Sequence, residues 1–127
     1  MSIETRGVHH IGLRVGDIGR SKTFYSGILG FKVLMEGDGY CLVDTGGTPI
    51  GLLGPAKNAD DRFDPFRVGV DHVALTVADI AALTRIKQRL DEAGVANNGL
   101  EVDPVLKGTY VSFHDPDGIA WEAYVLP

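Results

Sequence analysis

The sequences VHHIGLRVGDI at residues 8–18 and VDHVALTVADI at residues 70–80 follow one pattern in two separate parts of the chain. Valine, histidine, leucine, aspartate and isoleucine recur at matching positions. Matching apolar residues alone indicate that one supersecondary unit is used twice, because a buried strand needs apolar side chains wherever it occurs. His10 and His72 also match, and a repeated imidazole indicates a metal ligand or a catalytic group placed in both halves.

Each repeat opens a segment that predicts a strand, a helix and three more short strands. In the first, residues 8–15 alternate, which places His10, Gly12 and Arg14 on one strand face and apolar side chains on the other. Asp17 is positioned as the N-cap of a helix over residues 18–29, which Gly30 ends. Short apolar runs separated by glycine-rich turns predict an antiparallel meander over residues 31–35, 40–44 and 49–53.

The second half follows the same plan. Residues 70–77 predict a strand, Asp79 caps a helix whose apolar stripe runs from Ile80 to Ala93, and Gly94 ends it. Further strands are predicted at residues 99–105, 110–113 and 119–125. The chain therefore reads as two tandem βαβββ modules, residues 1–54 and 70–127, joined by a linker at residues 55–69 and forming a single α+β domain over residues 1–127.

Composition restricts the partners and the location. The net charge is −5 and the lysines and arginines are scattered, so we expect no nucleic-acid or anionic-membrane surface and a small molecule or another chain as partner. Cys41 is the only cysteine, which excludes an intrachain disulfide and a multi-cysteine metal site. Neither a leader pattern nor an apolar run of membrane length occurs, and we therefore expect a cytoplasmic protein.

A third polar group lies in the last predicted strand. Glu122 follows the turn His114–Gly118 and sits within an apolar run, where a carboxylate is costly unless it is paired or bound to a cation. Strand parity places Glu122 and Tyr124 on the face opposite Trp121. Two histidines and a carboxylate from three strands match the 2-His-1-carboxylate arrangement, which leaves coordination positions open. We predict a metal site formed by His10, His72 and Glu122; solvated surface histidines are the competing interpretation.

Several motifs together resemble the vicinal oxygen chelate superfamily, which includes glyoxalase I, bleomycin resistance proteins, fosfomycin resistance thiol transferases, methylmalonyl-CoA epimerase and extradiol dioxygenases. The resembling stretches are His10–Asp17, Phe24-Tyr25, Leu29–Phe31, Asp71–Leu75 and Asp115–Gly118 followed by Glu122. The resemblance implies a curved, mostly antiparallel sheet around a central cavity, with the helices outside. It also implies a divalent metal ion and a homodimer with sites at the junctions between modules.

Departures from the superfamily's pattern restrict the reaction. A fourth metal ligand is expected at Gly51, since Gly51 follows Gly47 as Glu122 follows Gly118, and glycine offers no ligand. This disfavours glyoxalase I and methylmalonyl-CoA epimerase, and Gly12 stands where fosfomycin transferases have a hydroxyl. The remaining triad is similar to that of extradiol dioxygenases. Those enzymes place a tyrosine acid where this chain has Ser112, so Tyr110 on the same strand is the substitute candidate.

The sequence therefore predicts a metal-dependent enzyme that binds a small substrate through two neighbouring oxygens, with extradiol cleavage preferred. Fe(II) is the favoured metal; Mn(II), Zn(II) or Ni(II) would suit glyoxalase-like lyase or isomerase chemistry. Tyr110 is the candidate acid, and Arg14, Leu53 and Tyr124 are candidate substrate contacts. The alternative from another class is a metal-free protein that binds a drug or metabolite, as bleomycin resistance proteins do.

Overall fold

A computed structural model describes residues 1–127, which divide into two compact units, Met1–Asp61 (unit 1) and Arg62–Pro127 (unit 2). The division falls within the segment 55–69, which the sequence predicts as a linker. None of the helices is long and apolar enough to span a membrane. Each unit carries one repeat of the sequence pattern, and the two are described in turn.

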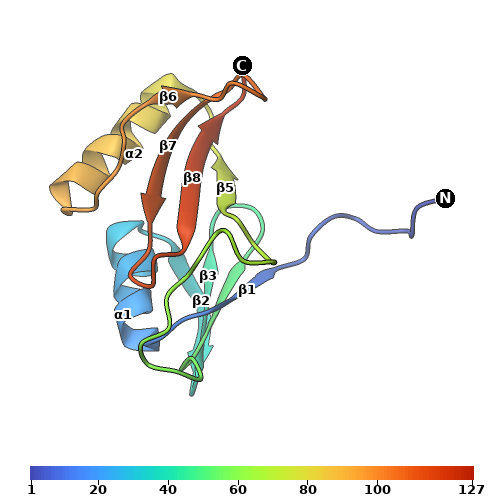
Figure 1. The fold of residues 1–127 in the computed structure, drawn as a ribbon, viewed down its shortest axis with the longest axis vertical. Coiled ribbons are helices and arrows are strands. Elements are labelled where there is room, and N and C mark those ends of the chain that lie inside the picture. The colour runs from blue at the N-terminus through green and yellow to red at the C-terminus, as the bar shows by residue number, and fades with distance from the viewer. The chain divides into compact units, whose positions relative to one another are not determined.

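Unit 1 consists of a helical segment and a four-stranded sheet (Figure 1). The sheet order is β1-β4-β3-β2, in which β2, β3 and β4 are antiparallel neighbours and β1 pairs in parallel with β4. The predicted meander is thus confirmed, and β1 is an edge strand that lies beside β4, the last strand of the module. The elements are β1 (Ile11–Arg14), α1 (Ile18–Lys22), η1 (Thr23–Ile28), β2 (Lys32–Gly37), β3 (Tyr40–Asp44) and β4 (Ile50–Leu53).

The first helix begins as predicted and changes form halfway. The Asp17 carboxylate accepts a hydrogen bond from the Arg20 N–H at 3.0 Å, which caps the first turn. From Thr23 the chain widens into the π-helical segment η1, in which Leu29 N–H donates to the Phe24 carbonyl at 2.9 Å. The wider turn accompanies the burial of the adjacent rings of Phe24 and Tyr25. Periodicity predicted the extent of this helix but not its π form.

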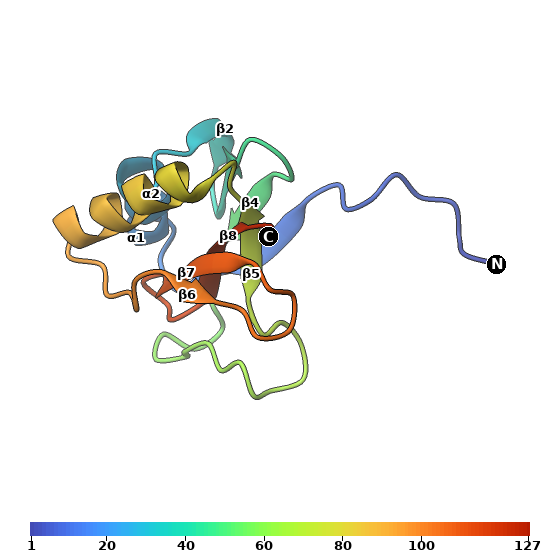
Figure 2. The same ribbon diagram turned by 90° about the horizontal axis from the view of Figure 1, so that it is seen from above.

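Unit 2 repeats the arrangement with a longer helix. Its sheet order is β5-β8-β7-β6, again with the first strand parallel to the last. Helix α2 packs against β7 and β8 and lies along one face of the sheet (Figure 2). The fold class predicted from the sequence, two βαβββ modules with mostly antiparallel pairing, is therefore confirmed. The elements are β5 (Val73–Thr76), α2 (Ile80–Glu92), β6 (Glu101–Val102), β7 (Thr109–His114) and β8 (Ala120–Val125).

The strand predicted at residues 99–105 is the largest departure, because β6 covers only two residues. The chain turns directly after it, with Asp103 N–H bonded to the Gly108 carbonyl and Lys107 N–H bonded to the Asp103 carbonyl. Lys107 takes a positive φ of 68°, which an extended strand would not allow. This turn, residues 103–108, lies beside the candidate site described below.

The core of unit 2 fixes which side chains of β8 face outward. Trp121 and Ala123 are buried together with Leu83 and Leu90 of α2, so the intervening Glu122 must face the opposite side of the sheet. The β7–β8 turn is closed by the buried Asp115, whose carboxylate accepts the N–H groups of Asp117 and Ile119. Packing on one sheet face therefore positions Glu122 on the other.

Candidate functional site

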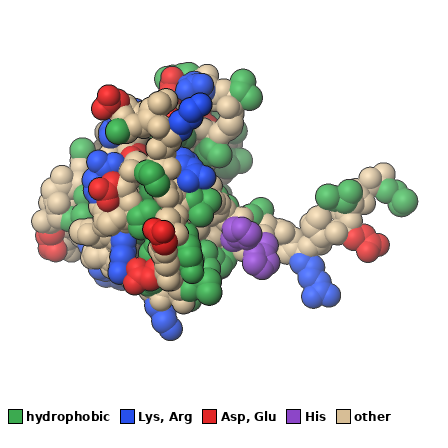
Figure 3. Space-filling model, turned by 90° about the horizontal axis from the view of Figure 1, so that it is seen from below, with side chains coloured by type: hydrophobic (Ala, Val, Ile, Leu, Met, Phe, Trp, Pro, Cys, Tyr) green, Lys and Arg blue, Asp and Glu red, His purple; other side chains and the backbone are tan.

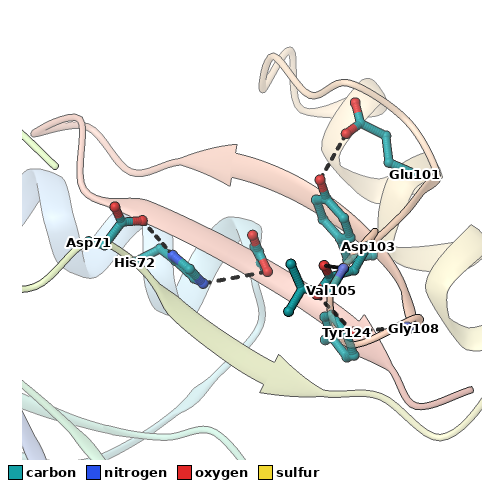
Figure 4. Close-up of polar contacts among 9 residues, drawn as sticks. Asp71, His72, Glu101, Asp103, Val105, Gly108 and Tyr124 are labelled. Carbon is teal, nitrogen blue, oxygen red and sulfur yellow. Dashed lines mark hydrogen bonds and ion pairs between the residues drawn. The ribbon is translucent and has the colours of Figure 1, made fainter. Parts of the chain in front are cut away.

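The clearest polar cluster of unit 2 joins His72 and Glu122. His72 directly precedes β5, and Glu122 lies on the neighbouring β8, where it is paired in register with Ala74. His72 Nε2 is 3.6 Å from Glu122 Oε1, and His72 Nδ1 is 2.6 Å from Asp71 Oδ1 (Figure 4). Glu122 is the more enclosed carboxylate, with 21 % of its side chain exposed against 71 % for Asp71.

The two sides of the His72 ring have different roles in this arrangement. When the neutral imidazole donates its Nδ1 proton to Asp71, Nε2 carries a lone pair that faces a carboxylate oxygen. Two acceptors face each other favourably only when a proton or a cation lies between them. A carboxylate on the far nitrogen is also the usual support of a metal-binding histidine. These donors therefore fit a divalent cation, because ligand distances of about 2.0–2.2 Å let one ion contact both atoms.

This pair opens into a hollow on the outward face of the unit 2 sheet. Its volume is about 540 Å³. The small side chain of Ala74, beside Glu122, leaves space next to the carboxylate. The lining combines the polar pair with aromatic and aliphatic side chains: His72, Ala74, Leu75, Thr76, Asp103, Val105, Leu106, Tyr110, Glu122, Tyr124 and Leu126.

Two tyrosines form one wall of the hollow. Tyr110 and Tyr124 are opposite each other in the β7–β8 register, and their rings are parallel within 7° with centroids 6.2 Å apart. The Tyr110 hydroxyl donates to Glu101 Oε2 at 3.0 Å, and this bond raises the tyrosine's pKa. The Tyr124 hydroxyl accepts the Gly108 N–H at 2.9 Å and donates to Asp103 at 3.1 Å, while burial is the main cause of its raised pKa.

Unit 1 has a corresponding hollow without the carboxylate. Gly12 pairs with Gly51 as Ala74 pairs with Glu122, so the strand registers place Gly51 at the position equivalent to Glu122, as the sequence repeat indicates. The hollow has a volume of about 230 Å³. It is lined by His10, Gly12, Met35, Tyr40, Cys41, Leu42, Gly51 and Leu53.

His10 lies in unit 1, just before β1, and is exposed. Its Nδ1 is 2.8 Å from Nδ1 of His9, and Figure 3 shows histidine side chains at the base of the extended N-terminal segment. Neither unit by itself contains a cluster of three or more His, Cys, Asp or Glu side chains that could hold a metal ion. The structure thus brings His72 and Glu122 together, while the third ligand, His10, stays a prediction.

The other predicted contacts are divided between the units. Arg14 is exposed and its Nη1 lies 3.5 Å from the Pro55 carbonyl, whereas Leu53 lines the hollow of unit 1. Tyr110 and Tyr124 line the hollow of unit 2. All four stay predictions as substrate or proton contacts.

Sequence reasoning missed Asp71 as the partner of His72. The repeat contained a signal for this role. Asp71 differs from its counterpart His9, and a carboxylate beside a candidate ligand histidine commonly orients that histidine. It also missed Glu101 and Asp103, which bind the two tyrosine hydroxyls.

A family model described as Glyoxalase/Bleomycin resistance protein/Dioxygenase superfamily matches residues 7–123. The chain belongs to this superfamily. The match spans both βαβββ modules, so membership concerns the whole two-module arrangement rather than one repeat. The superfamily includes lyases, oxygenases and binding proteins, so membership does not identify the reaction. The reaction has to be inferred from the side chains of the candidate site.

Similar proteins align along nearly the whole length. The chain is 30 % identical to the YaeR protein of Escherichia coli (strain K12), covering 92 % of this chain and 94 % of that one, and 29 % identical to YwkD of Bacillus subtilis (strain 168), covering 94 % and 96 %. A crystal structure of a glyoxylase/bleomycin resistance protein/dioxygenase domain from Frankia sp. EAN1pec is 32 % identical, with a TM-score of 0.84 and coverage of 98 % and 100 %. The two sequence relatives and the solved structure thus align with nearly the whole chain.

Proposed function

We propose that the chain is a metal-dependent enzyme that binds a divalent cation through His72 and Glu122 of unit 2, with His10 of unit 1 as the third protein ligand. The observation that carries the proposal is the 3.6 Å approach of His72 Nε2 to Glu122 Oε1, with the other ring nitrogen held by Asp71. The cation would supply Lewis acidity, which stabilises negative charge developing on two neighbouring substrate oxygens.

The chain's own residues have separable tasks in this proposal. Asp71 holds the Nδ1 proton of His72, so that Nε2 is available as a ligand. Glu122 supplies negative charge on the wall of the hollow, and Ala74 beside it leaves room for substrate. Tyr110 is the candidate acid, and its hydroxyl would have to leave Glu101 to donate a proton to substrate.

Extradiol ring cleavage is the reaction we propose to assay first. The support is the ligand count: Gly51 stands at the position equivalent to Glu122, and a site with three protein ligands keeps more coordination positions open than a site with four. Fe(II) is the metal proposed for this reaction. Lyase or isomerase activity with Mn(II), Zn(II) or Ni(II) is the second reaction class, assayed with a hemithioacetal substrate.

Metal content decides the first step. Protein purified without chelator, or reconstituted with each metal, is expected to hold about one divalent ion per site, and His72→Ala and Glu122→Gln are expected to lose it. His114→Ala is the matched control, because His114 is also exposed and lies on β7, outside the hollow. Wild type that binds no metal after reconstitution, or variants that keep full metal content, would refute the metal-dependent function.

The role of His10 as the third ligand is tested separately. His10→Ala is expected to weaken metal binding, whereas Val8→Ala serves as the control at an exposed position of the same segment that has no ring contact with His10. We also propose that the protein forms a homodimer. Light scattering tests the assembly, and activity regained on mixing inactive His10→Ala and His72→Ala proteins would show that a site draws residues from two chains.

Metal-free ligand binding is the second candidate function. The apolar walls of the unit 2 hollow favour this function. A binding protein depends mainly on apolar surface that encloses its ligand and does not require metal-ligating side chains. In that case a protonated His72 would bridge Asp71 and Glu122. Small-molecule binding that survives both chelator treatment and Glu122→Gln, in protein that never takes up metal, would favour this function over the enzyme.

A further inference from the structure

The hollow of unit 2 has walls that discriminate between ligands before any metal is considered. One wall is the parallel pair of Tyr110 and Tyr124. Both hydroxyls are bonded to acidic side chains, Glu101 and Asp103, so each polar end already has a partner. The ring surfaces that line the hollow therefore act as apolar and aromatic contact area rather than as hydrogen-bonding groups.

The rim of the hollow is apolar and exposed. Val105, Leu106 and Leu126 line it and have relative exposures of 80 %, 67 % and 70 %. Exposed apolar side chains gathered around a concavity mark a place where a ligand removes them from water. Val105 and Leu106 belong to the turn 103–108, which the Asp103 carboxylate closes through the Val105 N–H at 2.8 Å.

The permanent charges of the hollow have one sign. Its lining includes Asp103 and Glu122 but no lysine or arginine, and the imidazole of His72 lies between Asp71 and Glu122, which already pair with any charge on it. Lys107 is the nearest cation along the turn, and its ammonium group donates to the Pro104 carbonyl at 2.7 Å. The hollow thus lacks the basic side chain that would offset the charge of a carboxylate, sulfonate or phosphonate on a ligand.

We infer that this hollow takes a planar aromatic molecule without an anionic group, packed against Tyr124 and under the rim formed by Val105, Leu106 and Leu126. The inference deepens the proposed function. It rests on that function only where it orients the ligand, with two neighbouring oxygens directed toward His72 and Glu122. The flat body fits the tyrosine wall, the rim covers its apolar edge, and the two carboxylates repel anionic substituents. The metal-free site therefore selects uncharged aromatic ligands over their carboxylated relatives.

A matched pair of probes tests this directly. 2-Naphthamide and 2-naphthoate have nearly the same shape and differ by one negative charge, and the amide cannot chelate a metal through vicinal oxygens. Both are titrated into the full chain in the presence of EDTA, with the methyl NMR signals of Val105, Leu106 and Leu126 reporting the site. We expect 2-naphthamide to bind with a Kd on the order of 1 mM or below and about tenfold more tightly than 2-naphthoate.

Substitutions at exposed positions separate the two parts of the argument. Leu106→Ser is expected to weaken both probes about threefold to tenfold, because it removes rim contact without touching the core. Val105→Lys is expected to shrink the preference for the amide, because it adds a cation to the rim. Val102→Ser and Val102→Lys are the controls: Val102 is 67 % exposed on β6 but does not line the hollow, and neither change should alter binding.

Equal or tighter binding of 2-naphthoate, or no methyl shift for either probe at millimolar concentration, would overturn the inference. So would Val105→Lys and Val102→Lys having the same effect on the preference. The metal-content measurement is independent of these outcomes. A chain that binds no metal but prefers the amide loses only the proposed enzyme function, and one that binds metal without that preference loses only the ligand class.

Discussion

Removing the Asp71 carboxylate should weaken metal binding although Asp71 contacts no substrate or metal in the proposed site. The carboxylate lies 2.6 Å from His72 Nδ1 and fixes which ring nitrogen carries the proton. In Asp71→Ala the ring can rotate or place its proton on Nε2, the atom that faces Glu122. Either change removes a ligand from part of the population.

The size of the effect follows from the exposure of the pair. Loss of a carboxylate that supports a ligand histidine costs about tenfold to 100-fold in metal affinity. Asp71 is 71 % exposed, so solvent screens its charge, and exposed ion pairs contribute about 0.2–1 kcal/mol. We therefore expect the low end, about a tenfold loss, which corresponds to about 1.4 kcal/mol. Asp71→Asn keeps an oxygen acceptor and should lose less.

Competition with a chromophoric chelator measures the affinity, and Asp60→Ala is the control at an exposed aspartate outside the hollow. Nitrogen-15 NMR of the Zn(II)-loaded protein gives a second reading that does not depend on affinity. Wild-type His72 is expected to keep its proton on Nδ1 and bind through Nε2, and Asp71→Ala should shift part of the population toward a proton on Nε2. Unchanged metal affinity together with an unchanged tautomer in Asp71→Ala would refute this reasoning about the two sides of the ring.

Three further predictions concern the surroundings of the site. Tyr124→Phe should lower the free energy of unfolding in urea by about 1–3 kcal/mol, because the buried Gly108 N–H loses its acceptor; a loss no greater than that of Tyr110→Phe would contradict this. The Asp103 pKa is lowered, chiefly by the Val105 N–H, so its stabilising contribution is present above about pH 4 and lost as pH falls through the lowered pKa; thermal unfolding between pH 2 and 5 should show a shallower acid loss in Asp103→Asn. Gly51→Glu should add a carboxylate to the unit 1 hollow and raise metal affinity about tenfold by chelator competition, whereas Gly51→Gln and Gly47→Glu should not.

Local sequence signals predicted the elements well where the deciding contacts are close in sequence. Asp17 and Asp79 cap the two helices through their own first turns, and Gly30 and Gly94 follow them with φ of 76° and 72°. Strand parity also placed Glu122 opposite the buried Trp121, since alternation alone decides the face. These features need no knowledge of the distant parts of the chain.

The missed features depend on contacts that the sequence pattern does not encode. The π-helical segment accompanies the burial of both Phe24 and Tyr25, a packing arrangement that periodicity does not encode. The short β6 follows from the turn 103–108, where Lys107 adopts a positive φ that residue preferences disfavour. Glu101 and Asp103, the hydroxyl partners of Tyr110 and Tyr124, lie on that same strand and turn. The sequence interpretation of Tyr110 as a proton donor therefore did not include a hydrogen bond from its hydroxyl.

At the position of Glu122 the two modules differ in the side chain and not in the strand register. The registers make Gly51 equivalent to Glu122, and a Cβ built on Gly51 would meet its nearest neighbours at 3.8 Å, an ordinary contact distance. The strand therefore does not require glycine there, and the missing carboxylate is not a consequence of the fold. His9 replaces Asp71 in the same way, so unit 1 offers a histidine without an orienting carboxylate or a partner ligand. Unit 2 thus carries the candidate ligand pair and the larger hollow, and unit 1 has only the glycine-lined hollow beside its histidine.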